Sequence, residues 1–510
     1  MNYSTSLLLA LATAIPEQSQ HSDTQEPPVH SLPDVIAEPM RLIHELVLSF
    51  RTNAINPETT HLFEKQLQQR LRELGRLITQ WAYNSLEPTA VDPLPKHVVF
   101  QNNLHTRLNR KTPQNAWTLF GQITLRRVGY RPTDKTPEPT IFPLAMALGL
   151  TQGASPALAE RVGICLAEAG MTQKRTLERL RYDHNVGWGV KKLREVGATL
   201  ASQMAPHRQD VQVEQLLTWL QQADASRGRH NPLLCVGRDG VTLGMRYQGA
   251  CSFEVASTAT VSVLDRRGKR LGTVYLAYVP ESRQKTMSVA LTKLLEEVLR
   301  RYSGGSLRLG YVTDAGDNET SYYEKTLEGM LHPRTGERLK WIRVVDYYHV
   351  SQRVWTMAET LFGKCQRGIS WAKKMLKLLL KPSGANRVLH SAAAFRDQSR
   401  LRGKVLVEFE KAYGYIRDRM AYLHYAEYRR VGLPCGSGVT EAACKTVYAQ
   451  RLKLSGMRWK RVGAQVILDL RVVLLSGVWD AIYQRVLQSQ EQPHVRTQCP
   501  SGKQRARIGL

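Results

Sequence analysis

The feature that most constrains the fold of this chain is a change in residue pattern after Val345. Between Leu233 and Val345, short apolar or alternating runs are interleaved with helical periodicities, in the order β-β-β-α-β-α-β. From Ser351 the strand patterns cease, and residues 351–432 carry only helical periodicity. An order of this kind is typical of a mixed α/β sheet. Residues 351–432 are then expected to form an all-helical insertion into that domain.

Two acids follow apolar runs that are expected to form neighbouring parallel strands. Asp239 comes after the run Leu233–Val236, and Asp314 comes directly after Leu307–Val312. Because the carboxyl ends of adjacent parallel strands meet at one edge of a sheet, the two acids are expected to lie together there. Asp346 ends the next expected strand and is therefore the main rival to Asp314.

A third acid lies in Leu433–Lys460, where a Gly-Ser-Gly turn opens an expected helix. Glu441 is in the first turn of that helix, and Ser437 fits its N-cap because a hydroxyl can accept a hydrogen bond from a free backbone N–H. Three carboxylates at one sheet edge repel one another unless cations neutralise them. Hard oxygen ligands of this type suit two Mg²⁺ ions, with Mn²⁺ as a substitute.

The charge of the chain indicates a polyanionic partner. Lys and Arg number 71 against 44 Asp and Glu, a formal net charge of +27. Such an excess is typical of proteins that bind nucleic acid. Hydrophobic residues make up 42% of the chain, which excludes a disordered protein, and no apolar run reaches the roughly 20 residues needed to span a bilayer. Seven cysteines without a CxxC pair favour a reducing, cytoplasmic compartment.

Composition changes and Pro or Gly breaks divide the rest of the chain. Residues 144–210 have the pattern of three short helices with tight turns, which fits a helix-turn-helix or, equally, a plain helical packing module. The expected segments are a flexible N-terminus (1–33), a mainly helical region with a strand hairpin (34–131), the helix-turn-helix-like region (144–210), the α/β domain (231–350), the basic insertion (351–432), the final helices with Glu441 (433–487) and a disordered basic tail (488–510).

Four motifs occur in a fixed order along the α/β domain. They are VGRDG at 236–240, GYVTDAGDN at 310–318, VVDYYHV at 344–350 and GSGVTEAACKTVYAQRLKLSGMRW at 436–459. Together they resemble the DDE transposases of bacterial insertion sequences, closest to the Kra-type family, over roughly Thr118–Tyr483. The resemblance implies an RNase H-like catalytic core, related to that of Mutator-type and hAT-type transposases. It also implies a homo-oligomer that brings two DNA ends together.

The same resemblance assigns roles to individual residues. Asp346 and His349 match an accessory motif of Cys or Asp, two residues, then His. The paired cysteines common in the family after the hairpin at Thr118–Tyr130 are missing here, and Asp317 is a local rival to Asp314. The catalytic metal ligands implied by the resemblance are Asp239, Asp314 and Glu441.

Basic residues in the insertion and after Glu441 are expected to contact DNA phosphates, which give affinity without sequence information. His349 has three interpretations: a proton shuttle, a contact to the flanking DNA strand, or a hydrogen-bonded residue that fixes its turn. Trp459 either stacks on an unpaired base or packs in the core. The expected DNA contacts are Lys373, Lys374, Lys377, Arg451, Lys453, Arg458, Lys460 and Arg461.

The resulting prediction is a transposase of the bacterial cytoplasm and nucleoid that acts on double-stranded DNA. A metal-bound water cuts the element end, and the freed 3′-hydroxyl then attacks target DNA without a covalent protein intermediate. Two alternatives stay open: an RNase H-like nuclease that cleaves without joining, and a domesticated DNA-binding protein without catalysis. No membrane partner is expected.

Overall fold

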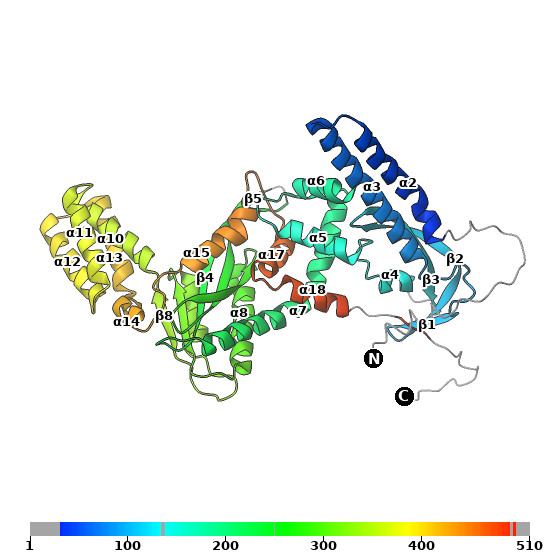
Figure 1. Ribbon diagram of the computed structural model, residues 1–510. Coiled ribbons are helices and arrows are strands. Elements are labelled where there is room, and N and C mark those ends of the chain that lie inside the picture. The colour runs from blue at the N-terminus through cyan, green and yellow to red at the C-terminus, as the bar shows by residue number, and fades with distance from the viewer. Residues whose placement is uncertain (1–30, 134–137, 249, 490–492, 496–510) are drawn as a thin grey trace, which may run out of the picture. The chain divides into compact units, whose positions relative to one another are not determined.

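The protein is described by a computed structural model, which covers residues 31–133, 138–248, 250–489 and 493–495 (Figure 1). The chain divides into two compact units. Unit 1 comprises Met1–Cys165, Thr172–Gln203 and Tyr483–Leu510, and unit 2 comprises Leu166–Met171 and Met204–Ile482. The three candidate catalytic acids all belong to unit 2.

Unit 1 begins with two long helices, α2 (Leu32–Thr52) and α3 (Pro57–Asn84). Each helix is opened by a capping box, in which the first side chain and the side chain three residues later satisfy each other's backbone N–H groups. The prediction that residues 1–33 are flexible is wrong for Ser31–Pro33, because Ser31 caps α2 and the helix starts at Leu32. Residues 1–30 lie outside the described residues.

The N-terminal region also contains an antiparallel sheet, where a mainly helical region with one hairpin was expected. Its strand order is β3-β2-β1-β9. The hairpin itself is confirmed, since its two long strands pair from Thr118 and Gly121 onward. The two-residue strand β9 pairs with β1, so the prediction that residues 488–510 are disordered is wrong for these two residues. Residues 490–492 and 496–510 lie outside the described part of the chain. The strands are β1 (His97–Phe100), β2 (Asn103–Thr118), β3 (Gly121–Pro132) and β9 (His494–Val495).

Four helices follow: α4 (Pro143–Ala147), α5 (Pro156–Ala167), α6 (Gln173–His184) and α7 (Val190–Ala225). The last three are the helices expected in 144–210. The expected end of α7 near Gln203 is wrong, because the helix has 36 residues and continues through Pro206. A helix of this length differs from the short third helix expected of a helix-turn-helix.

Unit 2 is built on a five-stranded mixed sheet with the order β6-β5-β4-β7-β8. The β6-β5-β4 pairs are antiparallel, and the β4-β7 and β7-β8 pairs are parallel. The expected succession of strands is confirmed, and so is the parallel pairing of Leu233–Val236 with the strand that begins at Arg308. The strands are β4 (Leu233–Arg246), β5 (Cys251–Leu264), β6 (Arg270–Tyr278), β7 (Arg308–Thr313) and β8 (Trp341–Val345).

Alternate residues of each strand point to opposite sides of this sheet, so both faces carry apolar side chains. Helices cover both faces. Leu234 and Val236 join a buried core with α8 (Lys285–Arg301), the second part of α7, and the α-to-π helix formed by α9 (Asp317–Tyr322) and Tyr323–Leu327. Leu233 belongs instead to the core of the opposite face.

The insertion, described over residues 351–432, contains helices joined by turns and no strand, as expected, and it packs on the sheet. Phe409 and Trp371 share one buried core with Val312 of β7 and Val344 of β8. The helices are α10 (Tyr347–Phe362), α11 (Gln366–Leu379), α12 (Gly384–Ser399), α13 (Gly403–Arg417) and α14 (Tyr425–Arg430).

The chain then returns to the sheet through α15 (Gly438–Ala443), a π-helical turn (Cys444–Ala449) and α16 (Gln450–Leu452). The single helix expected over Val462–Val486 is wrong. It breaks at Gly477, with φ +68°, into α17 (Arg461–Leu475) and α18 (Trp479–Gln488). Among the described residues, no single helix is long and apolar enough to cross a membrane, and α17 and α18 pass that test only as a pair bent by 114°.

Candidate active site

Asp239 lies inside β4 and not, as expected, in a turn after it. Gly237 and Gly240 resemble turn residues, but both belong to the strand and allow close packing. A Cβ on Gly237 would lie 2.0 Å from Thr440 Oγ1 of α15, and one on Gly240 would lie 2.6 Å from Val255 Cγ1. The parallel ladder pairs Val236 with Tyr311. Asp239 and Asp314 each lie three residues beyond this pair, and the charge of Asp314 acts on Asp239, as expected of two acids near one edge of the sheet.

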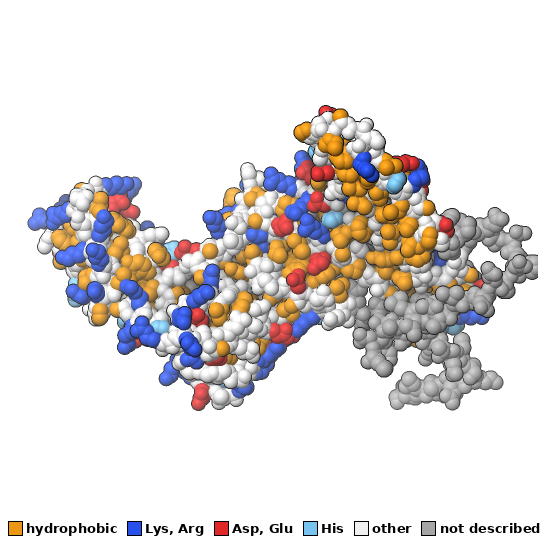
Figure 2. All heavy atoms as spheres, viewed as in Figure 1, with side chains coloured by type: hydrophobic (Ala, Val, Ile, Leu, Met, Phe, Trp, Pro, Cys, Tyr) orange, Lys and Arg blue, Asp and Glu red, His pale blue; other side chains and the backbone are white. Residues whose placement is uncertain are grey.

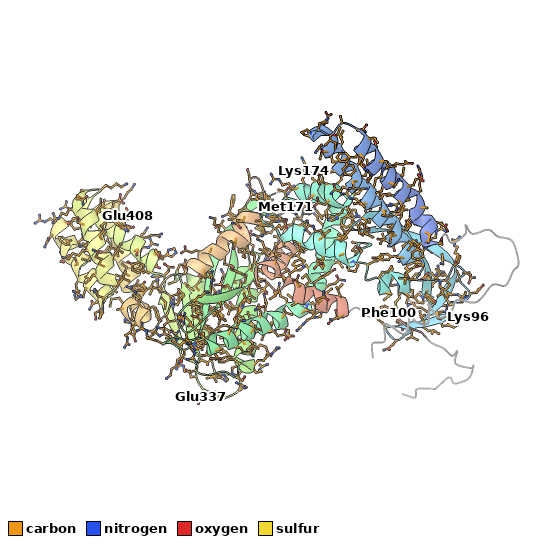
Figure 3. The ribbon with its side chains drawn as sticks, viewed as in Figure 1. Lys96, Phe100, Met171, Lys174, Glu337 and Glu408 are labelled. Atoms are coloured by element: carbon orange, nitrogen blue, oxygen red, sulfur yellow. The ribbon has the colours of Figure 1, made fainter. Side chains whose placement is uncertain are left out.

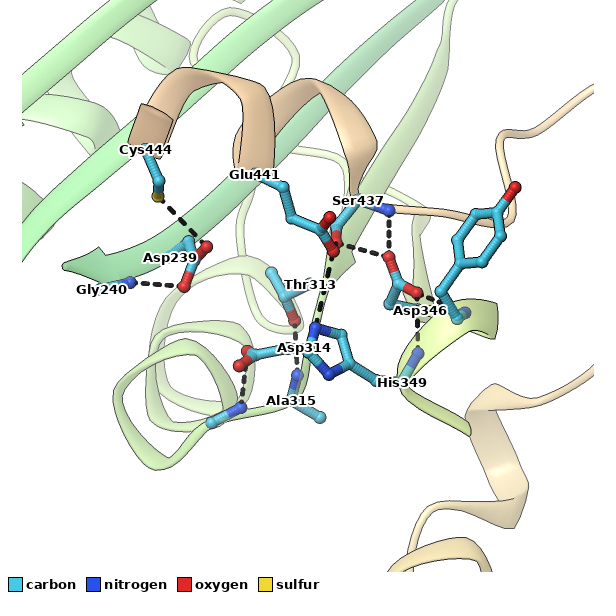
Figure 4. A network of polar contacts seen from close by, with 12 residues as sticks. Asp239, Gly240, Thr313, Asp314, Ala315, Asp346, His349, Ser437, Glu441 and Cys444 are labelled. Carbon is cyan, nitrogen blue, oxygen red and sulfur yellow. Dashed lines mark hydrogen bonds and ion pairs between the residues drawn. The ribbon is translucent and has the colours of Figure 1, made fainter. Parts of the chain in front are cut away.

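The carboxylate of Asp239 has two close contacts (Figure 4). Its Oδ1 accepts a hydrogen bond from the backbone N–H of Gly240 at 2.7 Å, and its Oδ2 accepts one from Cys444 Sγ at 3.2 Å. Burial raises the pKa of Asp239, and the negative charge of Asp314 raises it further. Burial and the charge of Asp314 therefore both act against the ionised form of Asp239, and a nearby positive charge would act in its favour.

Asp314 directly follows β7 in a loop that is fixed by the insertion. Its Oδ1 accepts from Gly316 N at 3.0 Å, and its backbone carbonyl accepts from Tyr415 Oη at 2.6 Å. The next residue, Ala315, is buried and has φ +61°, a left-handed conformation that is uncommon for a residue with a Cβ. Arg419 donates to its carbonyl at 3.2 Å. Tyr415 and Arg419 thus hold a strained loop beside the second acid, as is common at functional sites.

Glu441 lies in the single turn of α15, and its side chain is 49% exposed. Its Oε1 is 3.6 Å from Nε2 of His349 and accepts a hydrogen bond from Ser437 Oγ at 3.2 Å. The prediction that Ser437 caps this helix with its hydroxyl is wrong. The Ser437 side chain makes no capping bond, because its hydroxyl lies between the carboxylates of Asp346 and Glu441 and its one proton is directed at them instead.

Asp346 is fully buried, and its carboxylate connects the start of α10 to Ser437. Its Oδ1 accepts from the backbone N–H groups of Tyr348 at 2.5 Å and His349 at 3.1 Å, which makes it the N-cap of α10. Its Oδ2 accepts from both the backbone N–H and the hydroxyl of Ser437. A carboxylate offers about four lone-pair sites, and here all four accept hydrogen bonds from the protein. Asp317, the other rival, is exposed in the first turn of α9.

Two residues that the sequence analysis did not single out belong to the same site. Burial raises the pKa of the Cys444 thiol, and the charges of Asp239, Glu441 and Asp314 all raise it further, so one thiol lies within electrostatic reach of all three acids. Glu319 is buried, and its pKa is raised by burial and by the charges of Asp314 and Asp239. Cys444 follows Glu441 by three residues on one helical face, a spacing visible in the sequence. Glu319 had no such signal.

The donor chemistry fits hard divalent cations, although the side chains are not closed around an ion. Within the part of the chain that the structure describes, no Lys or Arg forms an ion pair with Asp239, Asp314 or Glu441; Glu441 pairs only with His349. In the same residues no three His, Cys, Asp or Glu side chains lie close enough together to hold one metal ion. The three acids are therefore not neutralised by basic side chains of the described residues, and bound Mg²⁺ would supply the missing positive charge.

The basic residues expected to bind DNA are exposed, with one exception. The prediction that Arg451 contacts DNA is wrong, because its side chain is fully buried and donates from Nε to the backbone carbonyl of Leu166 at 2.8 Å. Trp459 is 9% exposed and donates to the carbonyl of Leu452, so of its two interpretations packing is the one observed. The exposed members of the set are Lys373, Lys374, Lys377, Lys453, Arg458, Lys460 and Arg461.

Comparison with known proteins assigns no family to the chain: neither a protein-family model nor a curated protein matches it. Its function is therefore argued from the motifs and from the site described above.

Proposed function

We propose that unit 2 is the catalytic domain of a metal-dependent enzyme that cleaves and joins phosphodiester bonds in DNA. The observation that carries this proposal is the placement of three carboxylates, from β4, the end of β7 and α15, in one region of the site (Figure 4), where the charge of each acts on the same thiol, Cys444. None of the three is neutralised by a Lys or Arg within the described residues, whereas the chain as a whole has a net charge of +27. A negative site on a strongly basic protein suits cations bound next to a polyanion.

Within that class, we propose a DDE transposase of an insertion sequence, of the Kra-type family that the motifs resemble. The mixed five-stranded sheet supports the RNase H-like core that this resemblance implies. The all-helical segment between β8 and α15 supports the expected insertion before the last acid. Asp239, Asp314 and Glu441 stand in the order that the family requires.

Asp239, Asp314 and Glu441 would hold two Mg²⁺ ions, which ionise an attacking water or 3′-hydroxyl and stabilise the leaving oxygen of a phosphodiester. The neighbouring residues orient these ligands. Cys444 donates to Oδ2 of Asp239 and the backbone N–H of Gly240 donates to Oδ1, so each oxygen has one of these hydrogen bonds and a second lone pair for a metal ion. His349 lies 3.6 Å from Glu441 and is 33% exposed, so its ring is placed to exchange a proton with solvent or substrate.

The helical insertion supplies the proposed DNA surface. Lys373, Lys374 and Lys377 lie on the exposed side of α11, and Figure 2 shows Lys and Arg side chains spread over these helices. A groove of about 770 Å³ lies between α10 and α13. Its charged lining consists of Arg353, Lys404, Lys411 and Glu408, the last labelled in Figure 3.

The test is strand transfer by the purified full chain on DNA that carries the ends of the element, with Mg²⁺. Asp239→Asn, Asp314→Asn and Glu441→Gln should each lower the rate by at least about 100-fold, since metal ions contribute several kcal/mol to such reactions. DNA affinity should stay unchanged. Asp317→Asn is the matched control, because Asp317 is exposed in the same loop-to-helix segment, and it should retain the rate. Full strand transfer by Glu441→Gln would refute the proposal.

The products distinguish the two other functions that the sequence allows. Cleaved DNA without joined strands would identify a nuclease of the same chemistry. Mg²⁺-independent DNA binding, with no cleavage of element ends or of other DNA, would identify a DNA-binding protein without catalysis.

A further inference from the structure

The α2–α3 hairpin, Leu32–Asn84, exposes an unusual amount of apolar surface. Over its 28 residues α3 has no buried residue, and α2 buries only Pro39. Figure 2 shows hydrophobic side chains gathered over these two helices. The large apolar side chains exposed on the helices are Met40, Val47, Leu48, Leu62, Leu71 and Ile78, at 37–50%.

Four of these side chains, Met40, Val47, Leu71 and Ile78, belong to stripes with the repeat of a coiled coil. In α2 apolar residues recur at intervals of four and three, and a stripe with the same spacing runs along α3. Such a repeat places one apolar seam along each helix, which partner helices cover by inserting their own side chains. The stripes are Ile36, Met40, Ile43, Val47 and Phe50 in α2, and Leu67, Leu71, Leu74, Ile78 and Trp81 in α3.

Part of α3 is already occupied by the sheet of unit 1. A Cβ on Gly75 would lie 2.5 Å from the ring of Phe120, so the helix and the β2–β3 hairpin are in close contact there. The side chains of Gln80 and Asn84 accept from backbone N–H groups of β3, at Thr124 and Arg126. These contacts hold the hairpin in place. Phe50 of the α2 stripe is stacked on Phe63 of α3, whereas Met40, Val47, Leu71 and Ile78 are exposed with respect to the described residues.

The charge of the hairpin identifies what kind of partner can cover it. Residues 32–84 contain six Asp or Glu and six Lys or Arg, so the hairpin is neutral in a chain with a net charge of +27. Several of these charges are paired within a helix, as in Arg41 with Glu38 and Arg76 with Glu73. A neutral surface does not attract DNA, and two copies of it can approach without repulsion.

We propose that the α2–α3 hairpin is the self-association surface of this protein. Two copies pack their hairpins face to face into a four-helix bundle, the arrangement in which such seams are buried. The interface is isologous, because the same neutral, apolar face occurs on both partners. The helices contain 21 and 28 residues. If one face of each helix, about half of these residues, is in contact with the partner, the number falls in the range of roughly 20–30 residues per side of a stable interface. This inference is independent of the proposed catalytic function.

The experiment measures the mass of the full chain in solution without DNA, by light scattering and sedimentation velocity at high salt. The wild-type chain should have twice the monomer mass of 57.7 kDa. The double variant Met40→Glu/Leu71→Glu should have the monomer mass, with unchanged helix content by circular dichroism, because both side chains are about half exposed. Ile55→Glu is the matched control: Ile55 is 73% exposed but lies between the helices, and this variant should remain dimeric.

Amide exchange separates a second copy from other ways of covering the hairpin. Protection of the amides in 67–78 should rise with protein concentration in the wild-type chain and not in the double variant. A monomeric wild-type chain, a double variant that stays dimeric, or protection that is independent of concentration would each overturn the proposal. The last of these would indicate cover from the same chain. If the double variant loses helix content, Leu71→Gln alone decides: it should weaken dimerisation about tenfold or more. Because DNA is absent, the outcome does not depend on strand transfer.

Discussion

Exchange of Asp346 and of Asp314 for Asn, one at a time, separates a structural carboxylate from a proposed metal ligand. In Asp346→Asn the helix cap is kept, because Asn caps a helix about as well as Asp, and the bonds from Tyr348 and His349 to Oδ1 can stay. An amide nitrogen, however, replaces the oxygen that accepts two hydrogen bonds from Ser437. Hydrogen bonds to a charged group contribute about 1.5–3 kcal/mol each. The expected loss of stability is therefore about 3–6 kcal/mol, a fall in Tm on the order of 10 °C.

Asp314→Asn should behave in the opposite way. Asp314 is only partly buried, and its carboxylate accepts one hydrogen bond, from Gly316, which the Asn carbonyl can keep. The exchange also removes a charge that raises the pKa of Asp239 and repels it. Its effect on stability without metal should stay within about 1 kcal/mol. The loss should appear in the stabilisation by Mg²⁺, which requires a ligand that binds the folded state.

The assay is calorimetric unfolding of the two variants and the wild-type chain over a Mg²⁺ titration, following the transition that Mg²⁺ shifts. The wild-type Tm should rise with Mg²⁺. Asp346→Asn should start about 10 °C lower and show the same rise, whereas Asp314→Asn should start at the wild-type value and show little rise. A stable Asp346→Asn that has lost the Mg²⁺ response would refute this division of roles and make Asp346 the ligand.

Three further predictions test the packing around the site and a buried acid in unit 1. Gly237→Ala places a methyl group 2.0 Å from Thr440 Oγ1, so it should cost about 1–3 kcal/mol of stability in urea unfolding. Combining it with Thr440→Ala should restore part of that loss, and no recovery would contradict the contact. Tyr415→Phe removes the hydroxyl that holds the carbonyl of Asp314, so strand transfer should fall about fivefold at unchanged DNA affinity; an equal fall in affinity would argue against a positioning role. Burial raises the pKa of Glu87 from 4.5 to about 7, so the folded state binds more protons than the unfolded one, and about 3 kcal/mol of stability should be lost as pH rises through that interval. The urea midpoint of Glu87→Gln should lack this slope, and a wild-type midpoint that does not fall would count against it.

The succession of strands and helices along unit 2 could be predicted, because a strand or helix with one buried face has apolar residues at regular intervals within a short stretch of sequence. The same local rules failed for β4. Gly237 and Gly240 have the composition of a turn, yet both lie in the strand, where they make room for Thr440 and Val255. A missing side chain is required both in a tight turn and at a close contact. The sequence alone does not distinguish these two uses when the contacting residue, Thr440, is distant in the chain.

The residue types of the candidate site could be predicted from motifs, but their contacts could not. Ser437 has the local signature of an N-cap, and its hydroxyl is instead bonded to Asp346, which is 91 positions away in the sequence. Arg451 lies in a basic stretch of the kind that binds phosphates, and it is buried beneath the carbonyl of Leu166. In both cases a tertiary partner replaces the role that the neighbouring residues indicate.

The bond between Asp346 and Ser437 also explains how so large an insertion can precede the last acid. The insertion leaves the sheet at Asp346, which caps α10, and returns at Ser437, where α15 and Glu441 begin. Because both ends are fixed at one buried carboxylate, the length of chain between them has little influence on the position of Glu441. Within the insertion, α13 lines the basic groove with Lys411 and holds the Asp314 loop with Tyr415. A DNA backbone bound in that groove would therefore contact α13, the helix that positions the carboxylate of Asp314. Such a contact would link DNA binding to the geometry of the proposed metal site.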